Sequence, residues 1–279
     1  MSPTLIGAVL FSALLHAGWN ALLRQSEDRS WTAGWIGAAT MIVCAPFLPF
    51  VGWPTTIWPY VLASASLHVV YLGLLAKAYR LNELSFAYPI ARGSSPVLVA
   101  VGGLILAAEQ PSWLQAVGIF SIVAGIIGIG LDSTHWDREG LIVALQIGAV
   151  IAVYTVLDGM GARRGGNSLQ YNLWCFSIYG AAMLVRQFKT LGPKAFHGNA
   201  KDVGLAFGGG VTSVVAYGIV TWAMVHTKMG VVSALRETSI VFASVIGMVL
   251  LKEKFSSRKL AWSTLIAVGA VLIGISSRG

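Results

Sequence analysis

Long apolar runs separated by short polar breaks cover almost the whole chain. Each run is close to the length of about 20 residues that a helix needs to cross a bilayer. The runs fall at 4–23, 32–50, 58–79, 85–107, 112–131, 140–160, 168–187, 203–225, 230–251 and 258–276. Because they are continuously apolar and do not alternate, they predict helices and exclude the strands of a membrane barrel. The pattern predicts an all-α integral membrane protein with ten transmembrane helices.

Composition supports a membrane protein. Of the 279 residues, 56% are hydrophobic and 11% are charged, and the mean hydropathy is +0.74. Soluble domains carry about 25% charged residues, so these values exclude a soluble globular protein, a disordered chain and a collagen. Ten helices of about 20 residues leave no room for a soluble catalytic domain.

The net charge of +8 comes mainly from lysines and arginines in the short loops. In loops between apolar runs, basic residues indicate topology and contacts with lipid headgroups, so no nucleic-acid partner is expected. Cys44 and Cys175 each lie inside an apolar run and are expected to be packing residues. The first run lacks a basic segment before it, which predicts a retained span instead of a cleaved signal peptide.

The basic residues are distributed unequally between the two sides of the predicted bundle. Four lie on the side of the termini: Arg163, Arg164, Lys228 and Arg278. Twelve lie on the opposite side: Arg24, Arg29, Arg80, Arg138, Arg186, Lys189, Lys194, Lys201, Lys252, Lys254, Arg258 and Lys259. By the positive-inside rule, this excess predicts that both termini lie outside the cytoplasm.

The two halves of the chain resemble each other at a constant offset. Arg92 and Glu109 match Arg236 and Glu253, since 236 − 92 and 253 − 109 both equal 144. The same offset pairs Ser95 with Ser239, Val97 with Val241, Gly103 with Gly247, Gly125 with Gly269 and Gly130 with Gly274. An odd number of spans per repeat forces opposite orientations, so we expect two inverted five-helix repeats, 1–135 and 136–279. Inverted repeats with a binding site at their interface are typical of secondary transporters.

Three motifs carry a resemblance to a known family. They are HAGWN at 16–20, YPIARG at 88–93 followed by Glu109, and SALRETS at 233–239 followed by Glu253. In this order, in ten spans, they resemble the drug/metabolite transporter superfamily, EamA type, including its YddG-type amino-acid exporters. The resemblance implies a multi-pass carrier of the bacterial inner membrane that works by alternating access and has cytoplasmic termini. The loop charges indicate the opposite orientation.

Charged residues inside predicted spans are candidates for the site, because a charge at membrane depth costs several kcal/mol. Arg92 and Arg236 lie on matching spans, and each guanidinium can bind a carboxylate or phosphate through two hydrogen bonds. Asp158 and Glu237 are candidate counter-charges that accept a substrate ammonium or exchange a proton, which makes protons a candidate partner. The alternative is structural: Arg236 pairs with Asp158 or Glu237 and links helices.

Polar and aromatic residues complete the predicted site. His16 and Asn20 share one face of the first span, where they contact substrate or hydrogen-bond another helix. Tyrosines combine an apolar face with one hydroxyl, which suits a mostly apolar cavity, and packing is their alternative role. The aromatic candidates are Tyr71, Tyr88, Tyr154, Tyr217 and Trp222. Pro89 and Pro96 interrupt the fourth span and predict a hinge beside Arg92.

Two competing functions remain beside amino-acid export. An organic-anion carrier of the same fold would use the two arginines to clamp a phosphorylated or phosphonate metabolite. An integral membrane enzyme is a different class, and residues 158–163 match the D-G-x-x-A-R core of CDP-alcohol phosphotransferases. That chemistry needs further metal-binding acids, where Phe176 and Gly180 stand instead. We therefore expect an exporter of amino acids and similar small metabolites, with no enzymatic activity, cofactor or metal.

Overall fold

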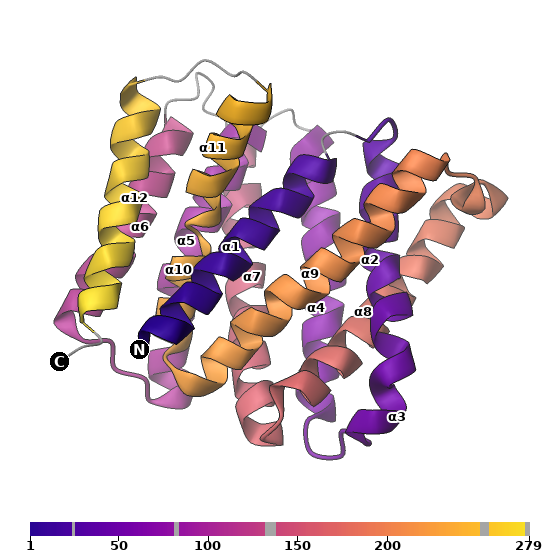
Figure 1. Ribbon diagram of the computed structural model, residues 1–279, viewed down its shortest axis with the longest axis horizontal. Helices are drawn as coiled ribbons and strands as arrows, with labels where there is room; N and C mark the ends of the chain where they lie inside the picture. Colours follow the sequence, from indigo (N-terminus) through magenta and orange to yellow (C-terminus); the bar gives the residue numbers. More distant parts are fainter. Residues whose placement is uncertain (24–25, 81–83, 132–137, 252–256, 277–279) are drawn as a thin grey trace.

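The computed structural model describes residues 1–23, 26–80, 84–131, 138–251 and 257–276, and these form a bundle of long helices (Figure 1). No strand occurs in this part of the chain. The elements are α1 (Pro3–Leu23), α2 (Arg29–Cys44), η1 (Ala45–Phe47), α3 (Leu48–Val51), α4 (Trp58–Arg80), α5 (Leu84–Ala107), α6 (Trp113–Leu131), α7 (Arg138–Gly165), α8 (Ser168–Leu191), η2 (Gly192–Phe196), α9 (Ala200–His226), α10 (Met229–Arg236), α11 (Ser239–Leu251) and α12 (Ser257–Ile275). The predicted runs 32–50 and 230–251 each contain more than one of these elements, and each of the other runs begins and ends within a few residues of one helix.

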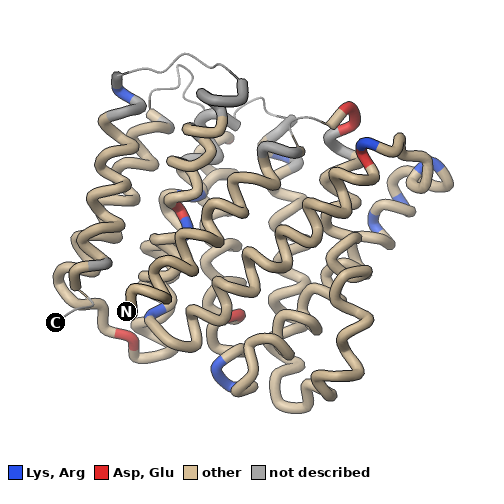
Figure 2. Tube along the Cα trace, viewed as in Figure 1, with Lys and Arg blue, Asp and Glu red and all other residues tan. Residues whose placement is uncertain are grey.

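Several of these helices are long and apolar enough to cross a membrane. By length and hydropathy, five segments of the described residues qualify: Trp31–Val51, Trp58–Leu75, Ile90–Ala107, Arg138–Gly165 and Ala200–His226. Two shorter apolar helices cover Trp113–Ile129 and Ala261–Ile273. Charged residues gather at the helix ends, with a small group inside the bundle (Figure 2). The fold is thus an all-α membrane fold.

The polar breaks begin the helices by capping them. The Asp28 carboxylate accepts the backbone N–H of Trp31 at 2.9 Å, at the start of α2. Asn167 and Asn199 cap α8 and α9 in the same way, because each side chain accepts the backbone N–H of the residue three positions later. Short polar side chains at these positions satisfy N–H groups that have no partner within the helix.

Glycines bring α6 and α12 into close contact. A Cβ atom on Gly118 would lie 2.8 Å from the Gly269 carbonyl oxygen, and one on Gly125 would lie 2.8 Å from that of Trp262. Small residues permit such backbone approach, which drives helix association in lipid. The α6–α12 pair lies at one end of the bundle, beside α5 and α11 (Figure 1).

The interruption expected at Pro89 and Pro96 is located elsewhere. Helix α5 runs unbroken from Leu84 to Ala107 through both prolines, whereas the expected span 230–251 is broken at Glu237 and Thr238 into α10 and α11. In α5, Pro96 has no N–H to offer the Arg92 carbonyl, and the Ser95 hydroxyl donates to that oxygen at 3.3 Å. A nearby hydroxyl therefore supplies the missing donor, and the helix continues.

Side-chain bonding to the backbone explains the break between α10 and α11. The Thr238 hydroxyl donates to the Leu235 carbonyl at 2.7 Å. The backbone N–H groups of Glu237 and Thr238 donate to Ala234 and Leu235, three residues earlier, which is the tighter 3₁₀ pattern. Threonine hydroxyls compete with helical bonding in this way. The break thus follows directly after Arg236 and Glu237.

Candidate functional site

A cavity of about 200 Å³ lies inside the bundle. Its walls come from α1, α2, α4, α5, α7, α8, α9 and the end of α10. The lining residues are Ser12, His16, Trp19, Asn20, Leu23, Ala33, Ile36, Gly37, Thr40, His68, Tyr71, Leu72, Leu75, Arg92, Tyr154, Phe176, Tyr179, Ser213, Ala216, Tyr217, Val220 and Arg236. The two arginines are the charged groups among them, and no aspartate or glutamate belongs to the described part of this lining.

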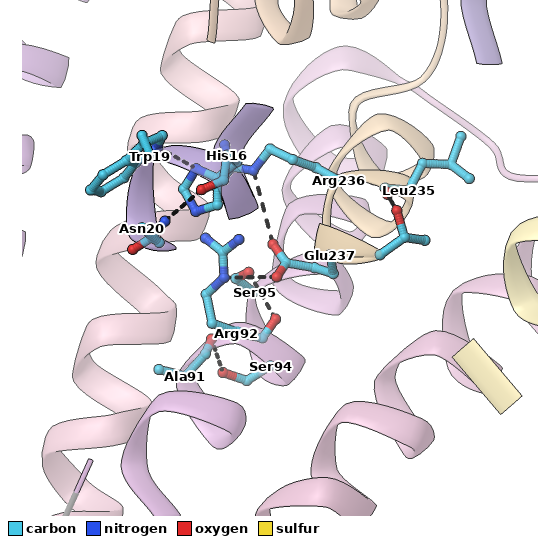
Figure 3. A network of polar contacts seen from close by, with 11 residues as sticks. His16, Trp19, Asn20, Ala91, Arg92, Ser94, Ser95, Leu235, Arg236 and Glu237 are labelled. Atoms are coloured by element: carbon cyan, nitrogen blue, oxygen red, sulfur yellow. Dashed lines mark hydrogen bonds and ion pairs between the residues drawn. The ribbon is translucent and has the colours of Figure 1, made fainter. Parts of the chain in front are cut away.

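Arg92 and Arg236 approach one carboxylate, that of Glu237 (Figure 3). Arg92 Nε lies 2.7 Å from Glu237 Oε2, whereas Arg236 Nε lies 4.0 Å from Oε1. Glu237 is fully buried, and the arginine side chains are 4% and 7% exposed. A buried carboxylate persists as a charge only when it is paired, so the Arg92–Glu237 contact ties α5 to the turn after α10. The remaining guanidinium, on Arg236, is the more weakly paired with Glu237.

Arg236 is held by aromatic groups in addition. Its guanidinium carbon lies 5.5 Å from the centre of the Tyr217 ring, within the range of a cation–π contact. Tyr154, which also lines the cavity, lies close enough to Arg236 for the two side chains to interact electrostatically. These contacts orient the guanidinium from the side of the cavity and leave it in the cavity wall.

Asp158 lies behind Tyr217 and is fully buried. The Tyr171 hydroxyl donates to Asp158 Oδ1 at 2.7 Å, and the Tyr217 hydroxyl donates to Oδ2. Each oxygen therefore has a hydroxyl partner, which offsets part of the cost of burying the charge.

Aromatic rings form much of the cavity wall. His68 stacks on Tyr154 at 4.0 Å between ring centres and lies 6.0 Å from Tyr217. Phe176 contacts Tyr217 edge-to-face at 5.7 Å. Such rings offer apolar area with few polar anchors, an arrangement typical of small-molecule sites.

The motif at 16–20 contributes a polar corner. His16 Nδ1 accepts from Trp19 Nε1 at 3.3 Å, and Asn20 Nδ2 donates to the His16 carbonyl at 2.7 Å. Figure 3 shows His16 beside the guanidinium groups of Arg92 and Arg236. His16 therefore lies next to both guanidinium groups in the cavity wall.

The structure brings most of the predicted site residues together. His16, Asn20, Tyr71, Arg92, Tyr154, Tyr217 and Arg236 line the cavity. Glu237 and Asp158 lie directly behind the lining, bonded to Arg92 and to Tyr217. Both carboxylates were predicted to face the substrate, and in the structure each lies one layer of side chains behind the cavity wall.

Four predicted residues are not part of this described group. Trp222 does not line the cavity; its side chain is 38% exposed and lies against His226. Tyr88 and Pro89 belong to α5, but their side chains lie outside the described part of the structure. Pro96 lies on α5 one turn beyond Arg92, in a helix without a break.

Several cavity residues were missed by sequence reasoning. Phe176 and Tyr179 lie three residues apart on α8, and His68 lies one turn before Leu72 on α4. The three-residue aromatic spacing on α8 was the available signal. It was weak because a membrane helix is apolar all round, so periodicity does not show which face turns inward.

Other charged contacts lie away from the cavity. Lys77 pairs with Glu139 at 2.9 Å with both side chains about half exposed, and Arg163 pairs with Glu109 at 2.5 Å. In the described residues, no group of three or more histidine, cysteine, aspartate or glutamate side chains could hold a metal ion. The site therefore offers guanidinium groups and aromatic faces to a ligand.

Comparison with known proteins identifies the family. Residues 138–275 match the EamA-like transporter family. The guanidinium exporters of Citrobacter freundii and Salmonella typhimurium are 31% identical over 106 residues, which is 38% of this chain and 99% of each relative. The chain belongs to the EamA-like transporter family.

Two further matches differ in how much of the proteins they cover. The nicotine metabolites export pump subunit NepA of Paenarthrobacter nicotinovorans is 31% identical over 71 residues. That match covers 25% of this chain and 61% of NepA, less than two thirds of its length. A solved crystal structure aligns over 99% of this chain and 98% of its own with a TM-score of 0.73 at 15% identity, which shows the shared fold.

Family membership has two direct consequences. The chain is a transporter and not an enzyme, and it is a multi-pass protein of the bacterial inner membrane. The cavity of this chain lies between helices from both halves, where the charged and aromatic residues described above converge.

Proposed function

We propose that this protein is an alternating-access exporter of amino acids and similar small metabolites that carry a carboxylate. The observation that carries the proposal is the charge of the cavity wall. Arg92 and Arg236 line it, and the carboxylate nearest to both, Glu237, is already bound by Arg92 at 2.7 Å. A substrate carboxylate would complete the charge balance at Arg236 through a bidentate guanidinium contact.

The relatives named as exporters support small-molecule export, but their cargo differs from that proposed here. Guanidinium is a cation. Among the described residues of this cavity no carboxylate faces the lumen, and each Asp158 oxygen accepts from a tyrosine hydroxyl behind the wall. A cation would meet the guanidinium of Arg236, which Glu237 approaches only to 4.0 Å, so the wall favours an anionic group.

Cavity size supports a small substrate. The volume of about 200 Å³ lies below the roughly 300–1,000 Å³ of sites for drug-sized ligands. The aromatic wall suits an apolar side chain, and a substrate ammonium would lie against ring faces. These features fit a neutral amino acid better than a bulky drug.

The packing of the helices supports ten spans in two inverted repeats, 1–135 and 136–279. If α1, α2, α4, α5 and α6 correspond to α7, α8, α9, the α10–α11 pair and α12, several contacts between the halves fall into matching pairs. The contact of α5 with α7 corresponds to that of α11 with α1, and the contact of α4 with α7 corresponds to that of α9 with α1. The contacts α2–α9 and α8–α4 form a third such pair. Repeats that exchange their packing underlie alternating access.

The position of the cavity suggests which side loads substrate. On α1 and α4 its residues extend from the middle toward the ends at Leu23 and Arg80, at the top of Figure 1. Toward the other side lies an apolar cluster around Tyr171 that includes Ile57, Val61 and Ala162. Most of the basic residues belong to the loops on the side of these helix ends, so the positive-inside rule favours a cytoplasmic position for that side and an outside position for the termini.

A phosphorylated metabolite is the second candidate. Two guanidinium groups that converge within reach of one carboxylate could also converge on a phosphate, which takes more charge than a carboxylate. The two candidates differ in the number of arginines that a substrate must engage.

Counterflow in proteoliposomes tests the proposal. Vesicles loaded with a neutral amino acid, a phosphorylated sugar or guanidinium would be diluted into labelled forms of each, with and without an imposed proton gradient. Exchange of the amino acid supports the proposal. Exchange confined to the phosphorylated sugar would move the function to the second candidate, and exchange confined to guanidinium would contradict both.

A further inference from the structure

We infer that Asp158 is a positioning residue that acts through Tyr217 on the substrate anchor Arg236, and that Asp158 itself does not contact substrate. The inference rests on the proposed function in that it takes Arg236 as the anchor. It assigns a distinct task to a buried carboxylate, and it identifies the Tyr217 side chain as the connection between the cavity wall and the packed end of the bundle.

Three side chains that contact one another in turn make this connection. The Arg236 guanidinium carbon lies 5.5 Å from the centre of the Tyr217 ring, on the cavity side. The hydroxyl of the same ring donates to Asp158 Oδ2. Asp158 comes from α7, Tyr217 from α9 and Arg236 from α10, so the connection joins three helices.

The bonding of Asp158 excludes a direct role in binding. Its side chain is fully buried and does not line the cavity. Oδ1 accepts from Tyr171 at 2.7 Å, and Oδ2 accepts from Tyr217. A substrate ammonium would have to displace a tyrosine hydroxyl to reach either oxygen. A charge-assisted bond to a carboxylate is stronger than one between neutral groups, so the Tyr217 hydroxyl is held firmly.

The other end of the connection is rigid. Tyr171 is completely buried, and a Cβ atom on Gly161 would lie 2.3 Å from its ring and 2.8 Å from the Cβ of Tyr60. Asn172, the next residue, donates to the Thr221 hydroxyl one turn beyond Tyr217. Asp158 is therefore anchored in tight packing, and it transmits that fixed position to the Tyr217 ring and so to Arg236.

Two tyrosines on one carboxylate provide a matched pair of variants. Tyr217→Phe removes the bond to Oδ2 and keeps the ring, which Phe176 and His68 still contact. Tyr171→Phe removes the bond to Oδ1 of the same carboxylate, at a side chain that does not line the cavity. A general weakening of the fold would follow from either change, but a loss of Arg236 positioning follows only from the first.

The first readout is counterflow of labelled leucine in proteoliposomes, with the maximal rate and KM determined separately. We expect Tyr217→Phe to raise KM about five- to ten-fold, the scale of one ordinary intramolecular hydrogen bond. The maximal rate should change less than about two-fold, since the anchor remains present. Tyr171→Phe should leave KM near the wild-type value, and Asp158→Asn should resemble Tyr217→Phe.

The second readout needs no substrate. Hydroxyphenylglyoxal modifies guanidinium groups, and peptide mass spectrometry gives the rate at Arg236. We expect this rate to increase in Tyr217→Phe and to stay unchanged in Tyr171→Phe. Equal changes in the two variants, in KM or in modification rate, would overturn the inference. If the Arg236→Gln variant exchanged leucine as well as the wild-type protein does, the proposed anchor would be wrong. The modification rates would still decide whether Tyr217 positions Arg236.

Discussion

Helix α5 and the α10–α11 pair match at an offset of 144 residues, yet the arginines at their matching positions have different partners. Arg92 lies within the continuous α5 and pairs with Glu237 at 2.7 Å. Arg236 lies at the end of α10, 4.0 Å from the same carboxylate and against the Tyr217 ring. Two residues at matching places thus have different tasks: one is neutralised, and the other remains available in the cavity wall.

The difference originates in one position. Glu237 corresponds to Gly93, since 237 − 144 = 93, so the second half has a carboxylate where the first has none. One glutamate cannot neutralise two arginines, and the uncompensated positive charge lies in the cavity. In the proposed site, one added carboxylate makes the two arginines at matching sequence positions unequal.

Removal of Glu237 should give the largest effect. Glu237→Gln leaves two buried guanidinium groups without a counter-charge, and breaking a buried pair costs about 3–5 kcal/mol. Unfolding in SDS, followed by circular dichroism, would measure the loss. Glu139→Gln is the control, because its pair with Lys77 is about half exposed and exposed pairs contribute below about 1 kcal/mol. Equal stability of the two variants would show that Glu237 is not needed to balance the arginines.

The two arginines should separate transport from stability. Arg236→Gln removes the available guanidinium, and we expect kcat/KM for a carboxylate substrate to fall by at least about ten-fold, the loss of one charge-assisted contact. Arg92→Gln leaves Glu237 buried without its 2.7 Å partner, so its main effect should be on unfolding. Counterflow and SDS unfolding on both variants would check this. Transport losses of the same size at the same stability would mean that the two arginines act equivalently.

The break between α10 and α11 should affect turnover more than binding. Thr238→Val keeps the shape of the side chain but removes the hydroxyl bond to the Leu235 carbonyl. That bond is worth about 1 kcal/mol, and without it the regular helix gains in stability relative to the break. We expect the maximal rate of counterflow to fall about three- to five-fold at an unchanged KM. A raised KM at a normal rate would place Thr238 in binding instead.

Ser95→Ala should give the smallest effect. It removes a hydroxyl donor from the Arg92 carbonyl, at a bond of 3.3 Å beside Pro96. We expect a loss of about 0.5–1 kcal/mol in SDS unfolding and near-normal transport. Thr238→Val and Ser95→Ala together test whether the two hydroxyls have opposite tasks, one to interrupt a helix and one to preserve it.

Much of the architecture was predictable from the sequence because helix ends in this chain are polar. Asp28, Asn167 and Asn199 lie in polar breaks between apolar runs, and in the structure each caps the helix that follows. The location of the break was not predictable, since it depends on where the Thr238 hydroxyl bonds, while the two prolines were the stronger local signal. The outward orientation of the Trp222 side chain was missed, because a helix that is apolar on all faces has no periodic pattern to show which face turns inward.

For the candidate site, residue types were easier to predict than partners. Arg92, Arg236, Asp158 and Glu237 were recognisable as charges inside apolar runs. That Glu237 pairs with Arg92, and Asp158 with two tyrosines, depends on contacts between helices distant in the sequence. Spacing along the chain does not contain that information.

The central claim is that the cavity recognises a carboxylate through Arg236. Its most direct test is counterflow of labelled leucine against three competitors of nearly the same shape: leucine, leucinamide and isoamylamine. We predict that unlabelled leucine competes strongly and that the amide and the amine, which lack the carboxylate, compete at least about ten-fold more weakly. Arg236→Gln should abolish this preference. Equal competition by leucinamide in the wild-type protein, or a preference for the amine, would contradict the account.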